Sequence, residues 1–122
     1  MGESEINPIK YDKNNVYGSL ILLEEMEAAN LKSIVFSSST KVYGQKSNSL
    51  FNEEDSLSPI TVYRKTKVVL ENKLRDLHKS SRDSKVVILR YFNPIGAHPS
   101  ELIGDSPSDF PNNLMPFISH FS

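Results

Sequence analysis

The sequence predicts an α/β fold that is built around a parallel sheet. Two short apolar runs, Ser33–Ser37 and Lys85–Tyr91, have the composition of buried parallel strands, and a segment with helical spacing precedes each of them. Helices that alternate with strands in this way cover a parallel sheet. Two strands are too few to complete such a sheet, because their edges and faces need partners. We therefore expect the chain to be a piece of a larger fold.

The first helix is expected over residues 14–29, where apolar side chains recur near helical spacing among acidic ones. The apolar set consists of Val16, Leu20, Leu23 and Met26. After the first strand, residues 40–61 are polar and rich in turn-forming residues. This composition predicts a long surface loop before the next helix.

The second helix should begin near residues 58–61, where a Ser or Thr can cap it, and should run to about Lys79. A pair at i, i+4, formed by Glu71 and Arg75, supports this helix. Its buried face would consist of Leu70, Leu74 and Leu77. An irregular tail rich in Pro, Gly and Asn begins at Asn93, after the second strand.

The composition excludes several classes of site and partner. The chain has 122 residues, a formal net charge of −1 and no cysteine. A nearly neutral chain offers no bulk attraction to nucleic acid or to an acidic membrane, and the lack of cysteine rules out disulfides and thiolate metal sites. The 3 histidines lie far apart, no apolar run is long enough to span a membrane, and the polar N-terminus lacks a secretory signal. We therefore expect a cytoplasmic protein with no bound metal and no nucleic-acid or membrane partner.

Tyr63 and Lys67 are the candidate catalytic pair. Residues four apart on a helix lie on the same face, so the ammonium of Lys67 would stabilise the phenolate of Tyr63 and lower its pKa. A tyrosine tuned in this way can act as a general base that takes a proton from a hydroxyl during hydride transfer. The spacing alone is a weak signal, because the same pair also fits a solvated first turn of an ordinary helix.

Polar and aromatic residues stand at the ends of both predicted strands, in Ser37–Ser39 and in Tyr91–Pro94. Ligands bind beyond the carboxyl ends of the strands in open α/β sheets, so these residues and the start of the Tyr63 helix would share one crevice. A serine hydroxyl in that crevice can donate to and accept from a substrate hydroxyl. For the serine run alone, a turn that satisfies backbone groups is the simpler interpretation.

Motifs that occur together in one enzyme family run along nearly the whole chain. The most specific are Leu89–Ser100 (LRYFNPIGAHPS) and Pro111–Pro116 (PNNLMP). The others are Asn14–Val16, Phe36–Ser39, Val42–Gly44 and the pair Tyr63 and Lys67. Together they resemble the extended short-chain dehydrogenase/reductase family, and within it the UDP-glucose 4-epimerases. The resemblance implies a Rossmann-type doubly wound parallel sheet, of which this chain would be a fragment.

The resemblance implies an NAD-dependent isomerase that interconverts UDP-glucose and UDP-galactose through a 4-keto intermediate, in galactose metabolism. Tyr63 would remove the proton of the sugar 4-hydroxyl, and Ser39 would hydrogen-bond the same hydroxyl and help to relay the proton. Lys67 would hold the nicotinamide ribose and keep the pKa of Tyr63 low.

The same resemblance implies further binding residues. Asn14 or Asn15 would lie near the cofactor, and the spacing does not separate the two. The other residues that would contact NAD are Ser39, Tyr63, Lys67, Tyr91 and Phe92. The UDP-sugar would contact Ser39, Asn93, Asn112, Asn113 and Leu114.

The Gly-rich phosphate-binding turn of this family does not occur in the sequence. Residues 1–92 would then be the C-terminal half of an NAD-binding domain, and residues 93–122 the start of a substrate-binding region. A homodimer or a complementing chain would supply the missing surface. One alternative is a truncated, catalytically inactive relative that acts through a partner chain. A 4,6-dehydratase of the same superfamily is disfavoured, because its acid/base carboxylate pair is replaced by Thr40 and Lys41 after Ser39.

Overall fold

The computed structural model describes residues 3–45, 50–96, 98–100 and 102. The chain forms two compact units, Met1–Phe92 and Asn93–Ser122, and the described helices and strands all belong to the first. None of the helices in those stretches is long and apolar enough to cross a membrane. The roles predicted for the two parts, cofactor binding and the start of substrate binding, stay predictions.

The first unit contains a parallel sheet, as the sequence predicts. Strand β1 (Ser33–Ser39) pairs with β2 (Lys85–Tyr91), and the register places Ser33 opposite Lys85 and Ser39 opposite Tyr91. β2 has the predicted bounds, whereas β1 continues beyond the predicted end to Ser39. It can do so because the hydroxyl of the buried Ser38 is hydrogen-bonded to a side chain of the covering helix.

Helical segments precede and follow β1. The α-helices are α1 (Glu3–Ile6), α2 (Pro8–Tyr11), α3 (Gly18–Ala28) and α4 (Val62–Ser80). A π-helical segment, η1 (Asp12–Tyr17), joins α2 to α3, and a short 3-10 helix, η2 (Thr40–Tyr43), follows β1. The helix predicted over residues 14–29 therefore starts earlier and contains a change of winding, which an apolar pattern alone does not reveal. The apolar residues that predicted it are all half-buried: Val16, Leu20, Leu23 and Met26.

Helix α4 begins where Thr61 caps it. The Oγ1 atom of Thr61 accepts a hydrogen bond from the backbone N–H of Arg64 at 3.4 Å, which resolves the choice that the sequence left open. Leu70 and Leu74 are buried, as expected, and Leu77 is half-buried. The apolar face of α4 is thus the face that packs on the sheet.

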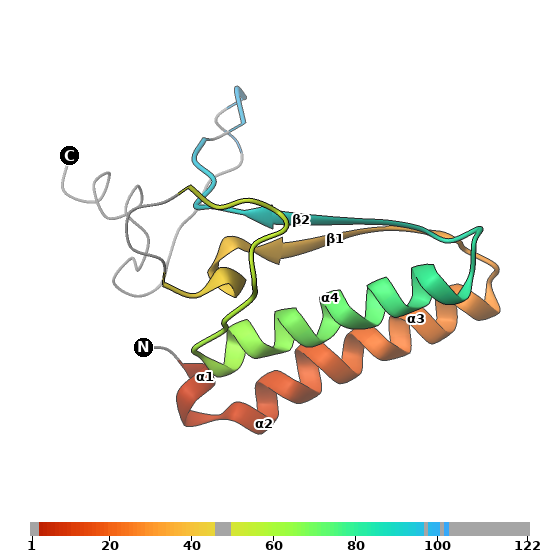
Figure 1. Ribbon diagram of the computed structural model, residues 1–122, viewed down its shortest axis with the longest axis horizontal. Helices are drawn as coiled ribbons and strands as arrows, with labels where there is room; N and C mark the ends of the chain where they lie inside the picture. Colours follow the sequence, from red (N-terminus) through yellow and green to blue (C-terminus); the bar gives the residue numbers. More distant parts are fainter. Residues whose placement is uncertain (1–2, 46–49, 97, 101, 103–122) are drawn as a thin grey trace. The chain divides into compact units, whose positions relative to one another are not determined.

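Helices α3 and α4 lie on the same face of the sheet (Figure 1). Side chains alternate along each strand, so Phe36 and Ser38 turn toward the helices. On the other face Val35 lies opposite Val87 in the register, and the two are 65% and 48% exposed. The expectation that two strands leave apolar surface uncovered is confirmed at this face.

Gly44 ends η2 in a conformation that glycine alone adopts readily, with φ +82° and ψ −149°. A Cβ atom there would collide with the carbonyl oxygen of Ser58. The backbone N–H of Ser58 donates a hydrogen bond to the carbonyl oxygen of Val42 at 3.0 Å, which holds the following loop against η2. Gly18 differs, because its angles are helical and the atom nearest to an added Cβ, Lys13 O, is 3.9 Å away.

We expect Gly44→Ala to lower the free energy of unfolding by at least about 1–3 kcal/mol, the cost of a strained backbone, before the collision is counted. Gly18→Ala is the matched change within a helix, and it should raise the free energy of unfolding by roughly 0.5–1 kcal/mol. Urea unfolding followed by circular dichroism measures both. Effects of the same sign would contradict this account of Gly44.

Candidate functional site

The carboxyl ends of the two strands meet at one edge of the sheet. Ser39 lies opposite Tyr91, and Thr40 Oγ1 donates a hydrogen bond to the carbonyl oxygen of Tyr91 at 3.0 Å. This is the edge at which open α/β sheets bind their ligands. The residues around it form the candidate site.

The first turns of α4 bring Tyr63 and Lys67 to this edge. The Nζ atom of Lys67 lies 5.8 Å from the centroid of the Tyr63 ring and 4.9 Å from that of Phe36. It donates a hydrogen bond to the carbonyl oxygen of Ser37 at 3.0 Å. The Tyr63 ring packs edge-on against Tyr11, with the centroids 6.5 Å apart. Tyr63 and Lys67 therefore share a face of α4, and Lys67 reaches across to β1.

Lys67 is half-buried, and its side chain reaches from the helix to the strand. Burial lowers the pKa of Lys67 below its ordinary value, because the charged form loses hydration. Within the stretches that the structure describes, no carboxylate forms an ion pair with it, and its hydrogen bond goes to a neutral carbonyl. An ammonium has three N–H donors, so two remain for the hydroxyls of a ligand.

Ser39 uses its oxygen to cap η2. Its Oγ atom accepts a hydrogen bond from the backbone N–H of Lys41 at 3.2 Å. The simpler interpretation of the serine run, a turn that satisfies backbone groups, therefore describes part of what Ser39 does. Because the hydroxyl acts here as an acceptor, its proton can still be donated to a bound ligand.

The structure distinguishes Asn14 from Asn15. Asn15 is half-buried in η1, and its Nδ2 atom donates a long hydrogen bond of 3.5 Å to Thr66 Oγ1. Thr66 is itself buried, and its hydroxyl donates to the carbonyl oxygen of Tyr63 at 2.7 Å. Asn14 is exposed. Asn15 is thus the one whose side chain contacts the helical turn that carries Tyr63 and Lys67.

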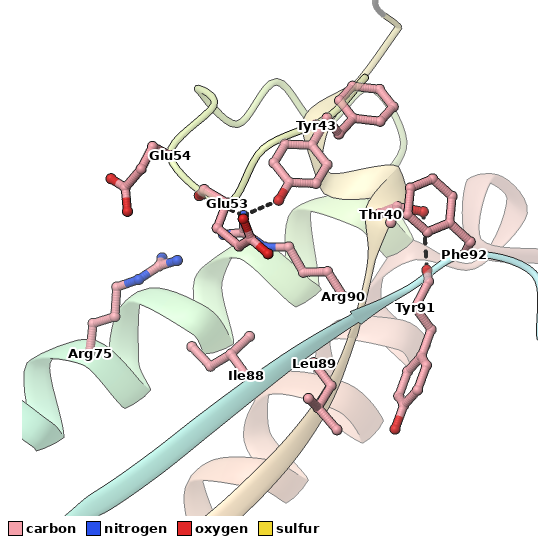
Figure 2. A pocket seen from close by; sticks show the side chains of 11 residues that line it. Thr40, Tyr43, Glu53, Glu54, Arg75, Ile88, Leu89, Arg90, Tyr91 and Phe92 are labelled. Atoms are coloured by element: carbon pink, nitrogen blue, oxygen red, sulfur yellow. Dashed lines mark hydrogen bonds between the residues drawn. The ribbon is translucent and has the colours of Figure 1, made fainter. Parts of the chain in front are cut away.

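The aromatic residues at the end of β2 are exposed. Tyr91 is 47% and Phe92 69% exposed, and both line an open cavity of about 450 Å³. Figure 2 shows Thr40 and Tyr43 among the other side chains around this cavity. A flat apolar group of a ligand could pack against these rings.

The other predicted residues belong to the second unit. Asn93 is exposed there. Asn112, Asn113 and Leu114, the predicted substrate contacts, lie outside the described residues. Among the residues that are described, no group of three or more His, Asp or Glu side chains is arranged to hold a metal ion.

A buried carboxylate that the sequence did not mark as functional lies beside this edge. Glu71 of α4 is 0% exposed. Its Oε1 atom accepts hydrogen bonds from Ser38 Oγ at 2.6 Å and from Arg90 Nε at 3.1 Å, and its Oε2 atom accepts from Arg90 Nη2 at 2.7 Å. The predicted pair with Arg75 also forms, at 3.1 Å. The available signal was Arg90 itself, because a charged residue inside an apolar strand needs a buried partner.

The cluster keeps its charges at neutral pH. Burial by itself raises the pKa of Glu71, but hydrogen bonds from Arg90 and Ser38 outweigh it, and so do the charges of Arg90 and Arg75. The pKa of Glu71 therefore lies below its ordinary value. The hydrogen bond to Glu71 raises the pKa of Arg90, against the opposite effect of burial. Both groups stay ionised.

Comparison with known proteins yields consistent matches. Residues 1–121 match the NAD dependent epimerase/dehydratase family. The UDP-glucose 4-epimerase of Bacillus subtilis (strain 168) is 49% identical over 119 residues, which make up 98% of this chain and 35% of that protein. UDP-glucose 4-epimerase 2 of Oryza sativa subsp. japonica is 48% identical over 118 residues, or 97% of this chain and 29% of that protein. The chain thus spans about a third of the length of these relatives.

Solved structures of similar sequence share the fold. The UDP-glucose-4-epimerase of Stenotrophomonas maltophila, with bound NAD and formylated UDP-arabinopyranose, matches with a TM-score of 0.93 and 44% identity over 98% of this chain and 35% of its own. The UDP-glucose 4-epimerase of Bifidobacterium longum, in complex with NAD+ and UDP, matches with a TM-score of 0.88 and 42% identity over 97% of this chain and 36% of its own. The predicted α/β fold is confirmed, and it corresponds to a part of these Rossmann-fold structures.

We expect the ammonium of Lys67 to titrate below about 10.4, the ordinary value, because burial disfavours its charged form. NMR of side chains labelled with ¹³C at Cε measures this pKa. Phe36→Leu should lower it further, since the ring that lies near the ammonium favours the charged form. A Lys67 pKa at or above the ordinary value would contradict the burial of this group.

The free energy of unfolding should fall as the pH drops through about 4.3, the ordinary pKa of a glutamate, toward the lower pKa of folded Glu71. Above this window the stabilisation from the lowered pKa is fully present. Glu71→Gln should flatten this part of the pH curve and cost roughly 3–5 kcal/mol at neutral pH, because it leaves Arg90 buried and unpaired.

Urea unfolding at several pH values tests this expectation. Glu24→Gln is the control, because it removes an exposed carboxylate on α3 and should change the free energy of unfolding at neutral pH by less than about 0.5 kcal/mol. An unaltered pH dependence in Glu71→Gln would show that other carboxylates dominate acid unfolding.

Proposed function

Since the chain belongs to the NAD-dependent epimerase/dehydratase family, we propose that it carries the catalytic groups of a UDP-glucose 4-epimerase, which interconverts UDP-glucose and UDP-galactose. The observation that carries the proposal is the position of Lys67, whose Nζ atom lies on the Tyr63 side of α4 and bonds to the end of β1. The identity of 49% to the Bacillus subtilis enzyme supports it. The relatives are about three times as long, so the rest of the site would come from outside these residues.

The residues present fit NAD. The half-buried Lys67 has donors left for ribose hydroxyls, because in the described part of the chain its ammonium contacts only neutral groups, the carbonyl of Ser37 and the rings of Phe36 and Tyr63. Asn15 contacts the same turn, whereas Tyr91 and Phe92 offer exposed rings to a nicotinamide. Asn14, the other asparagine of the pair, is exposed and remains a weaker candidate. When bound, NAD supplies the hydride acceptor that allows the sugar to pass through a 4-keto form.

The chain's own side chains would move the proton. Tyr63 takes the proton of the sugar 4-hydroxyl as general base and returns it afterwards. Ser39 would hydrogen-bond the same hydroxyl and help to relay its proton to Tyr63. Lys67 would hold the nicotinamide ribose, with its positive charge beside the Tyr63 ring. The UDP-sugar itself would be held by Asn93, Asn112, Asn113 and Leu114.

A second candidate is a non-catalytic relative that acts through a partner, either a second copy or a complementing chain. The exposed pair of Val35 and Val87 favours it, because an uncovered apolar sheet face stabilises association. Activity separates the two candidates. The catalytic one requires turnover that depends on Tyr63, and the other requires association without turnover.

Tyr63→Phe should lower the rate of UDP-galactose conversion by about 10²–10⁴-fold, the usual contribution of a general base, while the fold is kept. The formation of UDP-glucose in the presence of NAD measures this rate. Tyr17→Phe is the matched control, since it removes the hydroxyl of an exposed tyrosine. An unchanged rate in Tyr63→Phe would remove Tyr63 from the mechanism.

A wild-type chain without turnover calls for one further step. In this step a chimera is made, in which the chain replaces the matching segment of the Bacillus subtilis relative, aligned over 119 residues. Turnover of the chimera that is lost in Tyr63→Phe would support the catalytic role and point to a missing partner. An inactive but folded chimera would favour the non-catalytic candidate.

A further inference from the structure

Glu71 lies on the same helix as Tyr63 and Lys67 and bonds to both strands of the sheet. We propose that Glu71 is a positioning residue, whose buried carboxylate holds the ends of β1 and β2 against α4. It thereby fixes Ser39 and Tyr91 at the strand ends relative to Lys67, which is bonded to Ser37 two residues before Ser39. The inference rests on the proposed function for its catalytic consequence. Its geometric content, the fixed position of α4 on the strand ends, can be tested without turnover.

The first argument is the place of the two bonded strand residues. Ser38 and Arg90 lie opposite each other in the register, and each immediately precedes a candidate residue, Ser39 or Tyr91. Side chains alternate along a strand, so a strand that turns one residue toward α4 turns the next one away from it. By binding Ser38 and Arg90 together, Glu71 fixes the orientation of both following residues.

The second argument is the reach of Arg90. Its Nη1 atom donates hydrogen bonds to the Tyr43 hydroxyl at 2.6 Å and to the carbonyl oxygen of Glu53 at 3.1 Å (Figure 2). The guanidinium also lies 4.7 Å from the centroid of the Tyr43 ring, which stacks on Phe51 at 4.8 Å. One carboxylate therefore connects α4 with β1, β2, η2 and the loop that follows η2.

The third argument is energetic. A buried ion pair adds little net stability compared with apolar residues of the same size, because both charges lose their hydration. Its fork-shaped hydrogen bonds, however, allow only a narrow range of geometries. The ion pair of Glu71 and Arg90 therefore contributes mainly a precise position of α4 on the strands. A site that transfers a proton and a hydride requires such precision.

Ser38→Ala is the main test, because it removes one bond of Glu71 and keeps the ion pair. Ser84→Ala is the matched control. Ser84 is also buried and hydrogen-bonded, but it precedes β2 at the opposite end of the sheet. Both substitutions should lower the free energy of unfolding, measured with urea, by a similar amount. Glu71→Gln is the stronger variant and is compared under conditions where circular dichroism shows it folded.

The first readout is the contact between Lys67 and Phe36 in the folded chain. Nuclear Overhauser signals between the Cε protons of Lys67 and the ring protons of Phe36 report it. The signals should weaken or vanish in Ser38→Ala and in folded Glu71→Gln, and should persist in Ser84→Ala. Signals that persist in all folded variants, or that are absent from the wild-type chain, would overturn the proposal.

The second readout is epimerase turnover per folded molecule. Ser38→Ala and Glu71→Gln should lower kcat by up to about 100-fold, the effect of misplaced reacting groups, with KM for UDP-galactose changed by less than about twofold. Ser84→Ala should leave both unchanged. Changes in stability with an unchanged kcat would reduce Glu71 to a structural role. A wild type that shows the expected NMR response, but no turnover either alone or in the chimera, would reject the proposed function and keep the positioning role.

Discussion

The ion pair between Glu71 and Arg90 is the contact on which the arrangement of the first unit depends. Apolar side chains such as Leu70 and Leu74 hold α4 on the sheet, but apolar contacts are non-directional and tolerate small shifts. The fully buried carboxylate of Glu71 does not tolerate such shifts, because its hydrogen bonds replace the hydration that it loses on burial. The position of α4 along the strands is therefore set by charge, and the strength of the attachment is set by apolar contact.

The edge of the sheet beside this ion pair is suited to a ligand that carries hydroxyl groups. Lys67 has unused donors and Ser39 an unused proton, and among the described residues neither is bonded to a carboxylate. Glu71 and Arg90 neutralise each other beside the strand ends, and Arg75, which also pairs with Glu71, adds a positive charge farther along α4. A sugar or a ribose, whose hydroxyls both donate and accept hydrogen bonds, suits this edge.

Much of the fold could be predicted because its signals are local. The apolar run of β2 and the spacing of the leucines in α4 lie within single segments. The sequence also places the N-cap of α4 within residues 58–61, and Thr61 is the residue that caps it. The pair of Glu71 and Arg75 was predictable for the same reason. The contact of Glu71 with Arg90 was not, because a separation of 19 residues leaves no periodic trace.

The open sheet has a consequence for how this chain folds. β1 and β2 pair only with each other in the part of the chain that the structure describes, and the face that carries Val35 and Val87 is uncovered. Anything that binds these surfaces binds the folded state and not the unfolded one, so it shifts the folding equilibrium by mass action. Where a second copy of the chain is what binds, the fraction of folded molecules depends on the protein concentration as well as on the sequence. For such a chain a melting temperature has meaning only when the amount of protein is stated.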